Sequence, residues 1–171
     1  MNKKVIVFLC ILLLCDCSRE TSFEDVQIHY NNVTAYSGKY KYEIDFGGVT
    51  EFVCQYDYSE GKGSLTVLSP EEIAGITAVT DSTGQYLVFE DISIKTYLPP
   101  DKEAAPASAI HRLISDIRTS RPNLITETEV IELTYERGEY TKVARLSKED
   151  YAILSCEIFY NGDRILNITL Q

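Results

Sequence analysis

A strict alternation of apolar and charged residues between positions 39 and 46 restricts the fold of this chain more than any other feature. The apolar positions are Tyr40, Tyr42, Ile44 and Phe46, and the charged positions are Lys39, Lys41, Glu43 and Asp45. Side chains along a strand point alternately to its two faces, so this period of two predicts a strand with one buried face. A Gly-Gly turn at 47–48 and a second alternating segment predict an antiparallel partner strand. The apolar face of that partner consists of Phe52, Cys54, Tyr56 and Tyr58.

Turn residues recur along the rest of the chain at the spacing of a meander. A Gly-Lys-Gly segment at 61–63 predicts a hairpin, Pro70 ends the strand that follows, and an Asn-Gly pair at 161–162 predicts a terminal hairpin. The further strands expected are 64–69, 75–80, 85–97, 130–135, 140–146, 153–160 and 164–170. Short strands joined by hairpin-length links predict an antiparallel sheet.

Two segments have the spacing of amphipathic helices instead. The first is expected near the start of the domain, where Ser22 can cap it because its hydroxyl accepts a first-turn N–H. Its apolar residues are Phe23, Val26, Tyr30 and Val33. The second follows Pro106, a suitable first helical residue, and its apolar stripe consists of Ile110, Leu113, Ile114 and Ile117. We expect this stripe to lie on the concave face of the sheet, in an α+β fold that is mainly antiparallel β.

The N-terminal residues have the composition of a secretory signal. Two lysines precede ten apolar residues at 5–14, whereas a spanning helix needs about 20. The segment from Leu14 to Cys17 resembles the signal of bacterial lipoproteins, although Asp16 stands where that pattern prefers a small residue. The resemblance implies a signal peptide at 1–16, lipidation of Cys17, a tether at 17–22 and a domain at 23–171. It implies a lipid-anchored protein on the extracytoplasmic face of a bacterial cell membrane. The alternative is an ordinary cleaved signal peptide.

Removal of the signal leaves Cys54 and Cys156 as one candidate pair of thiols in the domain. An oxidising compartment would permit a disulfide between them. The alternative is two free thiols in the core, since an unpaired cysteine often behaves as a small buried hydrophobe. Both alternatives remain open from the sequence.

Three segments together resemble a known family. They are the strand at 63–70 that ends in proline, the turn and strand at 81–87, and the Ala-Pro-Ala segment at 105–107 before the central helix. Over about residues 23–171 the order of elements resembles the bacterial lipoprotein-carrier/receptor (LolA/LolB-like) superfamily. The resemblance implies an incomplete (half) β-barrel with covering helices, and a cavity for an acyl chain or an apolar segment of a partner. Carriers have an arginine where this chain has Ser69, and an anchored chain cannot shuttle, so we expect the fold without the shuttle activity.

Charge and motif content argue against nucleic-acid binding and against catalysis. A net charge of −10 opposes binding to a phosphate backbone. His29 and His111 belong to no zinc-binding spacing, and no Gly-x-Ser-x-Gly nucleophile motif is present. We therefore expect no enzymatic activity, no cofactor, no metal and no nucleic-acid partner.

Aromatic strand residues and the stripe of the central helix are the candidate lining of a ligand groove. The candidates are Tyr40, Tyr42, Phe46, Phe52, Tyr56, Tyr58, Tyr86, Phe89, Ile110, Leu113, Ile114 and Ile117. If these residues line a groove, we expect a lipoprotein that binds a lipid acyl chain or a lipidated peptide there. The alternative is that they form the core beneath the helix. The chain would then be an envelope protein–protein interaction module with a self-filled core and no small ligand.

Overall fold

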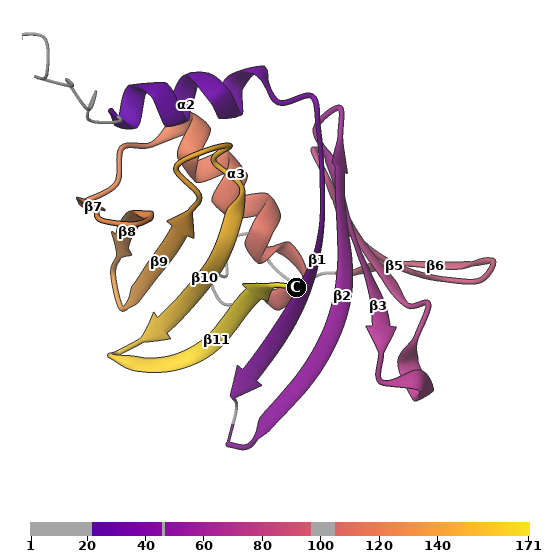
Figure 1. Cartoon of the computed structure of the whole chain (residues 1–171). Coiled ribbons are helices and arrows are strands. Elements are labelled where there is room, and N and C mark those ends of the chain that lie inside the picture. The colour runs from indigo at the N-terminus through magenta and orange to yellow at the C-terminus, as the bar shows by residue number, and fades with distance from the viewer. Residues whose placement is uncertain (1–21, 46, 97–104) are drawn as a thin grey trace, which may run out of the picture.

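The computed structural model describes residues 22–45, 47–96 and 105–171, and it shows one curved sheet with two helices on its concave side (Figure 1). Within this part of the chain the sheet has eleven strands, in the order β6-β5-β4-β3-β2-β1-β11-β10-β9-β8-β7. The expected signal peptide, the lipidation site at Cys17 and the groove candidate Phe46 lie outside the described residues.

The helices and strands follow the expected order. The helices are α2 (Phe23–Asn32) and α3 (Ala109–Thr119), with two short 3-10 helices, η1 (Glu71–Ile73) and η2 (Pro106–Ser108). The strands are β1 (Ala35–Asp45), β2 (Val49–Ser59), β3 (Lys62–Ser69), β4 (Thr77–Asp81), β5 (Gly84–Phe89), β6 (Ile92–Thr96), β7 (Leu124–Glu127), β8 (Ile131–Arg137), β9 (Tyr140–Leu146), β10 (Ile153–Tyr160) and β11 (Asp163–Leu170). The α+β fold with an open, curved antiparallel sheet is confirmed.

The N-terminal and C-terminal segments of the domain meet in the middle of the sheet. β1 pairs with β2 on one side and with β11 on the other, so Tyr42 lies between Phe52 and Ile168. This pairing joins the meander β1–β6 to the second group of strands, β7–β11. The two edges of the sheet are therefore β6 and β7.

The segment expected as one strand at 85–97 forms two strands instead. β5 and β6 make a hairpin in which Phe89 pairs with Ile92, so residues 90 and 91 form the turn. Glu90 has a φ of 51°, in the left-handed region that non-glycine residues seldom adopt. The turn therefore lacks the Gly or Asn that marks such a turn in a sequence. The four-residue strand β7, paired with β8, was also not expected.

The beginning of α2 agrees with the sequence. Ser22 Oγ accepts a hydrogen bond from the Asp25 amide at 3.3 Å, and the Asp25 carboxylate accepts one from the Ser22 amide at 3.3 Å. This reciprocal pair is a capping box, which satisfies two otherwise unpaired N–H groups. Phe23, Val26 and Tyr30 are buried beneath the helix.

The second helix lies across the concave face, as its apolar stripe predicts (Figure 1). Ile110, Leu113, Ile114 and Ile117 are each at most 1% exposed. Pro106 begins η2, which leads directly into α3. In the described residues, no helix has the length and apolar content needed to cross a bilayer.

An irregularity in β10 changes the face that one residue occupies. Alternation with Cys156 and Ile158 predicts Leu154 on the core face. The register between β10 and β9 instead shifts between Ile153 and Ser155, so Ile153 is fully buried and Leu154 is only partly buried. An extra residue in one strand moves the alternation by one position, which explains the difference.

Cys54 and Cys156 are both buried, free thiols in the described structure. Cys54 lies on β2 and Cys156 on β10, and the strands β1 and β11 separate them. Three inter-strand spacings of about 4.8 Å exceed the roughly 7 Å between Cα atoms that a disulfide tolerates. The structure therefore contradicts the disulfide, and it agrees with the alternative of two buried thiols.

Candidate functional site

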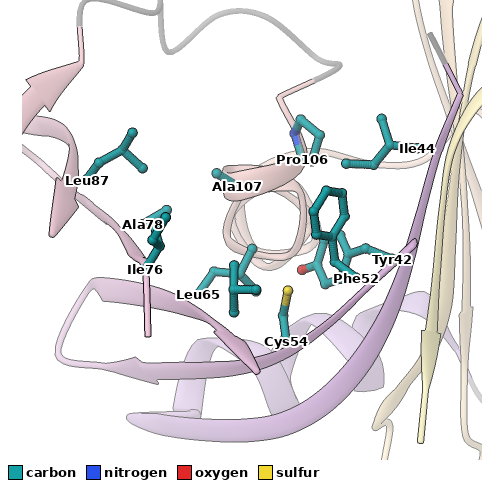
Figure 2. Close-up of a pocket in the computed structure, with 11 residues that line it drawn as sticks. Tyr42, Ile44, Phe52, Cys54, Leu65, Ile76, Ala78, Leu87, Pro106 and Ala107 are labelled. Carbon is teal, nitrogen blue, oxygen red and sulfur yellow. The ribbon is translucent and has the colours of Figure 1, made fainter. Parts of the chain in front are cut away.

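The candidate site is an apolar pocket between the concave face of β1–β5 and the start of the helix pair η2–α3 (Figure 2). Its volume is about 180 Å³. The residues that line it are Tyr42, Ile44, Phe52, Cys54, Leu65, Val67, Ile76, Ala78, Leu87, Pro106 and Ala107.

The register of the sheet brings these lining residues together. Tyr42 lies directly opposite Phe52, and Cys54 lies directly opposite Val67. Leu65, Ala78 and Leu87 form a continuous row across β3, β4 and β5. Residues in direct register point to the same face of a sheet, so the row forms one apolar wall.

Small side chains explain why a space remains at this point of the interface. Ala78 stands between two leucines in its row, and Ala107 faces the sheet from η2 where a larger residue would fill the gap. Leu87 is 41% exposed, so the pocket reaches solvent at β5. Figure 2 shows the Ala78 and Ala107 side chains on opposite sides of this space.

The chemistry of the pocket favours an uncharged apolar group. Tyr42 and Cys54 supply the polar atoms among the lining side chains. Burial raises the pKa of the Tyr42 hydroxyl well above its ordinary value, and burial raises the pKa of the Cys54 thiol to about 11. Both groups are therefore neutral at physiological pH. Among the described residues, no group of three or more His, Cys, Asp or Glu side chains is arranged to hold a metal ion.

The structure divides the sequence candidates into pocket and core. Tyr42 and Phe52 line the pocket. The candidates that belong to the buried core instead are Tyr40, Tyr56, Tyr58, Ile110, Leu113, Ile114 and Ile117. Tyr86 lies on the opposite face from Leu87, where its hydroxyl meets Thr83 Oγ1 at 2.8 Å. Phe89 is 44% exposed on the β5–β6 hairpin.

Hydrogen bonds within the core hold the hydroxyls of Tyr30, Tyr36 and Tyr40 away from the pocket. The hydroxyls of Tyr36 and Tyr40 are hydrogen-bonded to each other. Tyr40 also donates to the carbonyl of Ile153 at 3.2 Å, and the Ile153 amide donates to Tyr36 at 3.3 Å. Tyr30 donates to the carbonyl of Tyr151 at 2.8 Å. Protein partners thus satisfy the polar ends of these rings, as buried tyrosine requires.

The sequence candidates omit most of the pocket walls. Leu65, Val67, Ala78 and Leu87 continue the apolar alternation of β2 into the next three strands. A search restricted to aromatic residues does not find them. Once the order of the strands is known, the alternation of apolar residues along β3, β4 and β5 identifies these four residues as wall residues.

Arg118 joins the two helices to the sheet at the end of α3 that lies away from the pocket. Its guanidinium donates to the carbonyls of Tyr30 at 2.8 Å and Val33 at 2.7 Å, at the C-terminal end of α2. It also donates to the Tyr58 hydroxyl at 2.5 Å and lies over that ring. A cation near the C-terminal carbonyls of a helix is favourable, and here the helix that benefits is α2 rather than α3, which carries the arginine.

In the described residues the molecule is an open antiparallel sheet whose concave side holds two helices and a small apolar pocket. No family model matches the chain, and no curated protein matches it. An uncharacterized conserved protein from Thermus thermophilus is similar in structure, with a TM-score of 0.51, 9% identity, and coverage of 85% of this chain and 80% of that one. At this identity the likeness shows a shared fold alone.

Two further solved structures are similar at lower TM-scores. One is a chain from the CwlD amidase of Clostridioides difficile in complex with the GerS lipoprotein, with a TM-score of 0.49, 13% identity, and coverage of 88% of this chain and 94% of that one. The other is a putative outer membrane lipoprotein-sorting protein domain from Vibrio parahaemolyticus, with a TM-score of 0.47, 10% identity, and coverage of 87% and 88%.

Proposed function

We propose that this chain is a non-enzymatic lipoprotein on the extracytoplasmic face of a bacterial membrane that binds one apolar group in the pocket beneath Ala107. The ligand class is a lipid acyl chain or the acylated end of a lipidated peptide. The pocket itself supports the proposal, because its walls are apolar and Leu87 leaves it accessible from solvent.

The volume of the pocket sets the size of the group that it accepts. Pockets for drug-sized ligands have about 300–1,000 Å³, and a dry cavity of about 150 Å³ holds benzene. A pocket of about 180 Å³ therefore accommodates a short apolar segment. The end of an acyl chain fits this description, whereas a whole phospholipid does not.

The affinity expected from the pocket alone is modest. Burial of about six methylene groups at ~0.8 kcal/mol each contributes about 5 kcal/mol before the cost of association. That corresponds to a Kd of roughly 0.3 mM or weaker. Tighter binding requires more of the acyl chain to lie on the exposed side chains of Leu87 and Phe89 beside the pocket.

A fluorescent fatty-acid probe tests this function. The chain with Cys17→Ser is the background, because it carries no acyl chain of its own. We expect the probe to bind, and Ala107→Phe to weaken binding about tenfold or more by filling the pocket. Ala35→Phe is the matched control, since Ala35 is exposed on β1 away from the pocket. Absence of probe binding, or equal loss in both variants, would contradict the proposal.

The proposed anchor has a separate test. Radiolabelled palmitate should be incorporated into the wild-type chain and into Cys15→Ser, but not into Cys17→Ser. Label that persists in Cys17→Ser would show that the anchor lies elsewhere, and a wild-type chain without label would show that no anchor is attached. The pocket proposal does not depend on that result.

A second candidate function is that of an envelope protein–protein interaction module. The observation that favours it is the exposure of Phe89, Ile92 and Ile94 on the β5–β6 hairpin, together with a core that is largely filled by its own side chains. Under this alternative the fatty-acid probe does not bind at all, which separates the two candidates in the same experiment.

A further inference from the structure

The β5–β6 hairpin extends away from the rest of the molecule (Figure 1). Its exposed large side chains form an apolar patch on one face. Leu87, Phe89, Ile92 and Ile94 make up this arm patch, with exposed fractions of 41%, 44%, 61% and 60%. Leu87 pairs with Ile94 and Phe89 pairs with Ile92, so all four side chains project from the same face. Contiguous exposed apolar side chains of this kind mark an interaction surface.

The outer edge of this hairpin is also open. β6 is the last strand in the order of the sheet, and within the described residues no strand pairs with its outer side. An open edge presents unpaired N–H and C=O groups that favour addition of another strand. Natural edges are often protected by inward-pointing charges. The residues of β6 on the patch face are the uncharged Ile92, Ile94 and Thr96.

We propose that a second copy of this chain pairs with β6, strand to strand and antiparallel, with the two-fold axis at Ser93. In this register Ile92 of one copy lies opposite Ile94 of the other on the patch face. On the opposite face Asp91 of one copy lies opposite Lys95 of the other. Each of these contacts occurs twice because the pairing is symmetric.

The N–H and C=O groups of β6 point in directions that allow a two-fold axis at Ser93. The two-residue turn at 90–91 closes on the pair Phe89 and Ile92. The closing pair of such a turn is hydrogen-bonded across the hairpin, so the backbone groups of Ile92 face β5. Backbone direction alternates along a strand, which leaves the N–H and C=O groups of Ser93 and Lys95 directed toward the open edge. Ser93 can therefore pair with its own copy.

Charge favours a second copy and selects the register. Asp91 and Lys95 are both exposed, and they stand two residues on either side of Ser93. A centre at Ser93 therefore places unlike charges opposite each other, whereas other symmetric centres do not pair these two residues. A membrane surface is a poorer occupant, because Glu90 and Asp91 at the hairpin tip would be repelled by anionic lipids.

Cysteine cross-linking in the cell envelope tests the proposed dimer on the full chain. A hydrogen-bonded antiparallel pair has its Cα atoms about 5.5 Å apart, which is within the range for a disulfide. We expect Ser93→Cys to give a disulfide-linked dimer on a non-reducing gel after mild oxidation. Thr126→Cys is the matched control, because Thr126 is exposed on β7 at the opposite edge of the sheet and should stay monomeric.

A charge exchange tests the register. In the Ser93→Cys chain, Asp91→Lys places two lysines opposite each other and should lower the cross-linked fraction roughly fivefold or more. Adding Lys95→Asp to the same chain restores unlike pairs and should restore cross-linking. A monomeric Ser93→Cys chain, or equal cross-linking of Thr126→Cys, overturns the dimer. A cross-linked fraction that stays the same after Asp91→Lys overturns the register.

Discussion

At the scale of single residues, the absence of a side chain at position 63 allows α3 to lie close to the sheet. A Cβ atom at Gly63 would stand 2.6 Å from His111 Nδ1 and 2.8 Å from the Tyr56 hydroxyl. His111 Nδ1 and the Tyr56 hydroxyl are themselves 3.5 Å apart, and the His111 ring packs against Tyr58. Burial lowers the pKa of His111, with Arg118 as the next cause. The histidine is therefore a packed, neutral part of the helix–sheet interface rather than a solvated side chain.

The first prediction concerns this close approach. Gly63→Ala should lower the free energy of unfolding by about 1–3 kcal/mol, because the added methyl group forces His111 and Tyr56 apart in a packed interface. The urea midpoint of unfolding measures the change. Gly48→Ala is the matched control, since nothing lies within 4 Å of a Cβ atom there, and its midpoint should change little. Equal midpoints for both variants would show that the interface near Gly63 adapts freely.

At the scale of secondary-structure elements, a buried ion cluster joins α3 to the C-terminal strands. Asp116 on α3 accepts from Lys142 Nζ on β9 at 2.5 Å and from Arg137 on β8 at 2.7 Å. The side chains of Asp116 and Lys142 are 8% and 4% exposed. Ionised groups are costly to bury without partners, so this pairing restricts the positions that α3 can take on the sheet.

The second prediction follows from that burial. Asp116→Asn should lower the free energy of unfolding by about 3–5 kcal/mol, because it removes the negative charge that pairs with the buried Lys142 ammonium. Chemical denaturation measures the loss. Glu51→Gln breaks the Lys41–Glu51 pair, in which Glu51 is 58% exposed, and should cost less than about 1 kcal/mol. Comparable losses in both variants would contradict the role assigned to burial.

At the scale of the whole molecule, the pairing of β1 with β11 makes one core from two groups of strands. Cys54 belongs to the first group and Cys156 to the second, and they are 2% and 0% exposed. Burial raises the pKa of the Cys54 thiol to about 11 and that of Cys156 to about 12. Their reactivity therefore reports on the integrity of the whole sheet.

The third prediction uses these two thiols. At pH 8 a thiol with a pKa of about 11 is only about one thousandth thiolate, so both cysteines should resist iodoacetamide in the folded chain. In denaturant both should be alkylated without any reductant, as peptide mass spectrometry measures. Alkylation of these peptides that requires a reductant would show a disulfide and would contradict the structure.

Periodic and capping signals were sufficient to predict most elements and the fold class. The alternation in β1 and β2, the Ser22 cap of α2 and the apolar stripe of α3 all act within a few residues, and the structure agrees with each of them. The turn at Glu90 could not be predicted in this way, because a glutamate there carries none of the usual turn preference.

The candidate site was predicted only in part, because its walls come from six separate elements. Tyr42 and Phe52 were expected and line the pocket, but the α3 stripe was expected there and lies in the core. Side-chain periodicity predicts which residues are buried. It does not predict whether other side chains fill the space next to those residues.

Local spacing and composition were therefore enough to predict most of the strands, the helix on the concave face and the neutral, apolar character of that face. The edges of the sheet, the separation of the two thiols and the position of the pocket became known only from the folded chain. The pairing of β1 with β11 places Cys54 and Cys156 three strands apart, and Ala78 and Ala107 leave the pocket only because the sheet and η2 bring them together. These outcomes depend on contacts between residues far apart in the chain, which no local pattern encodes.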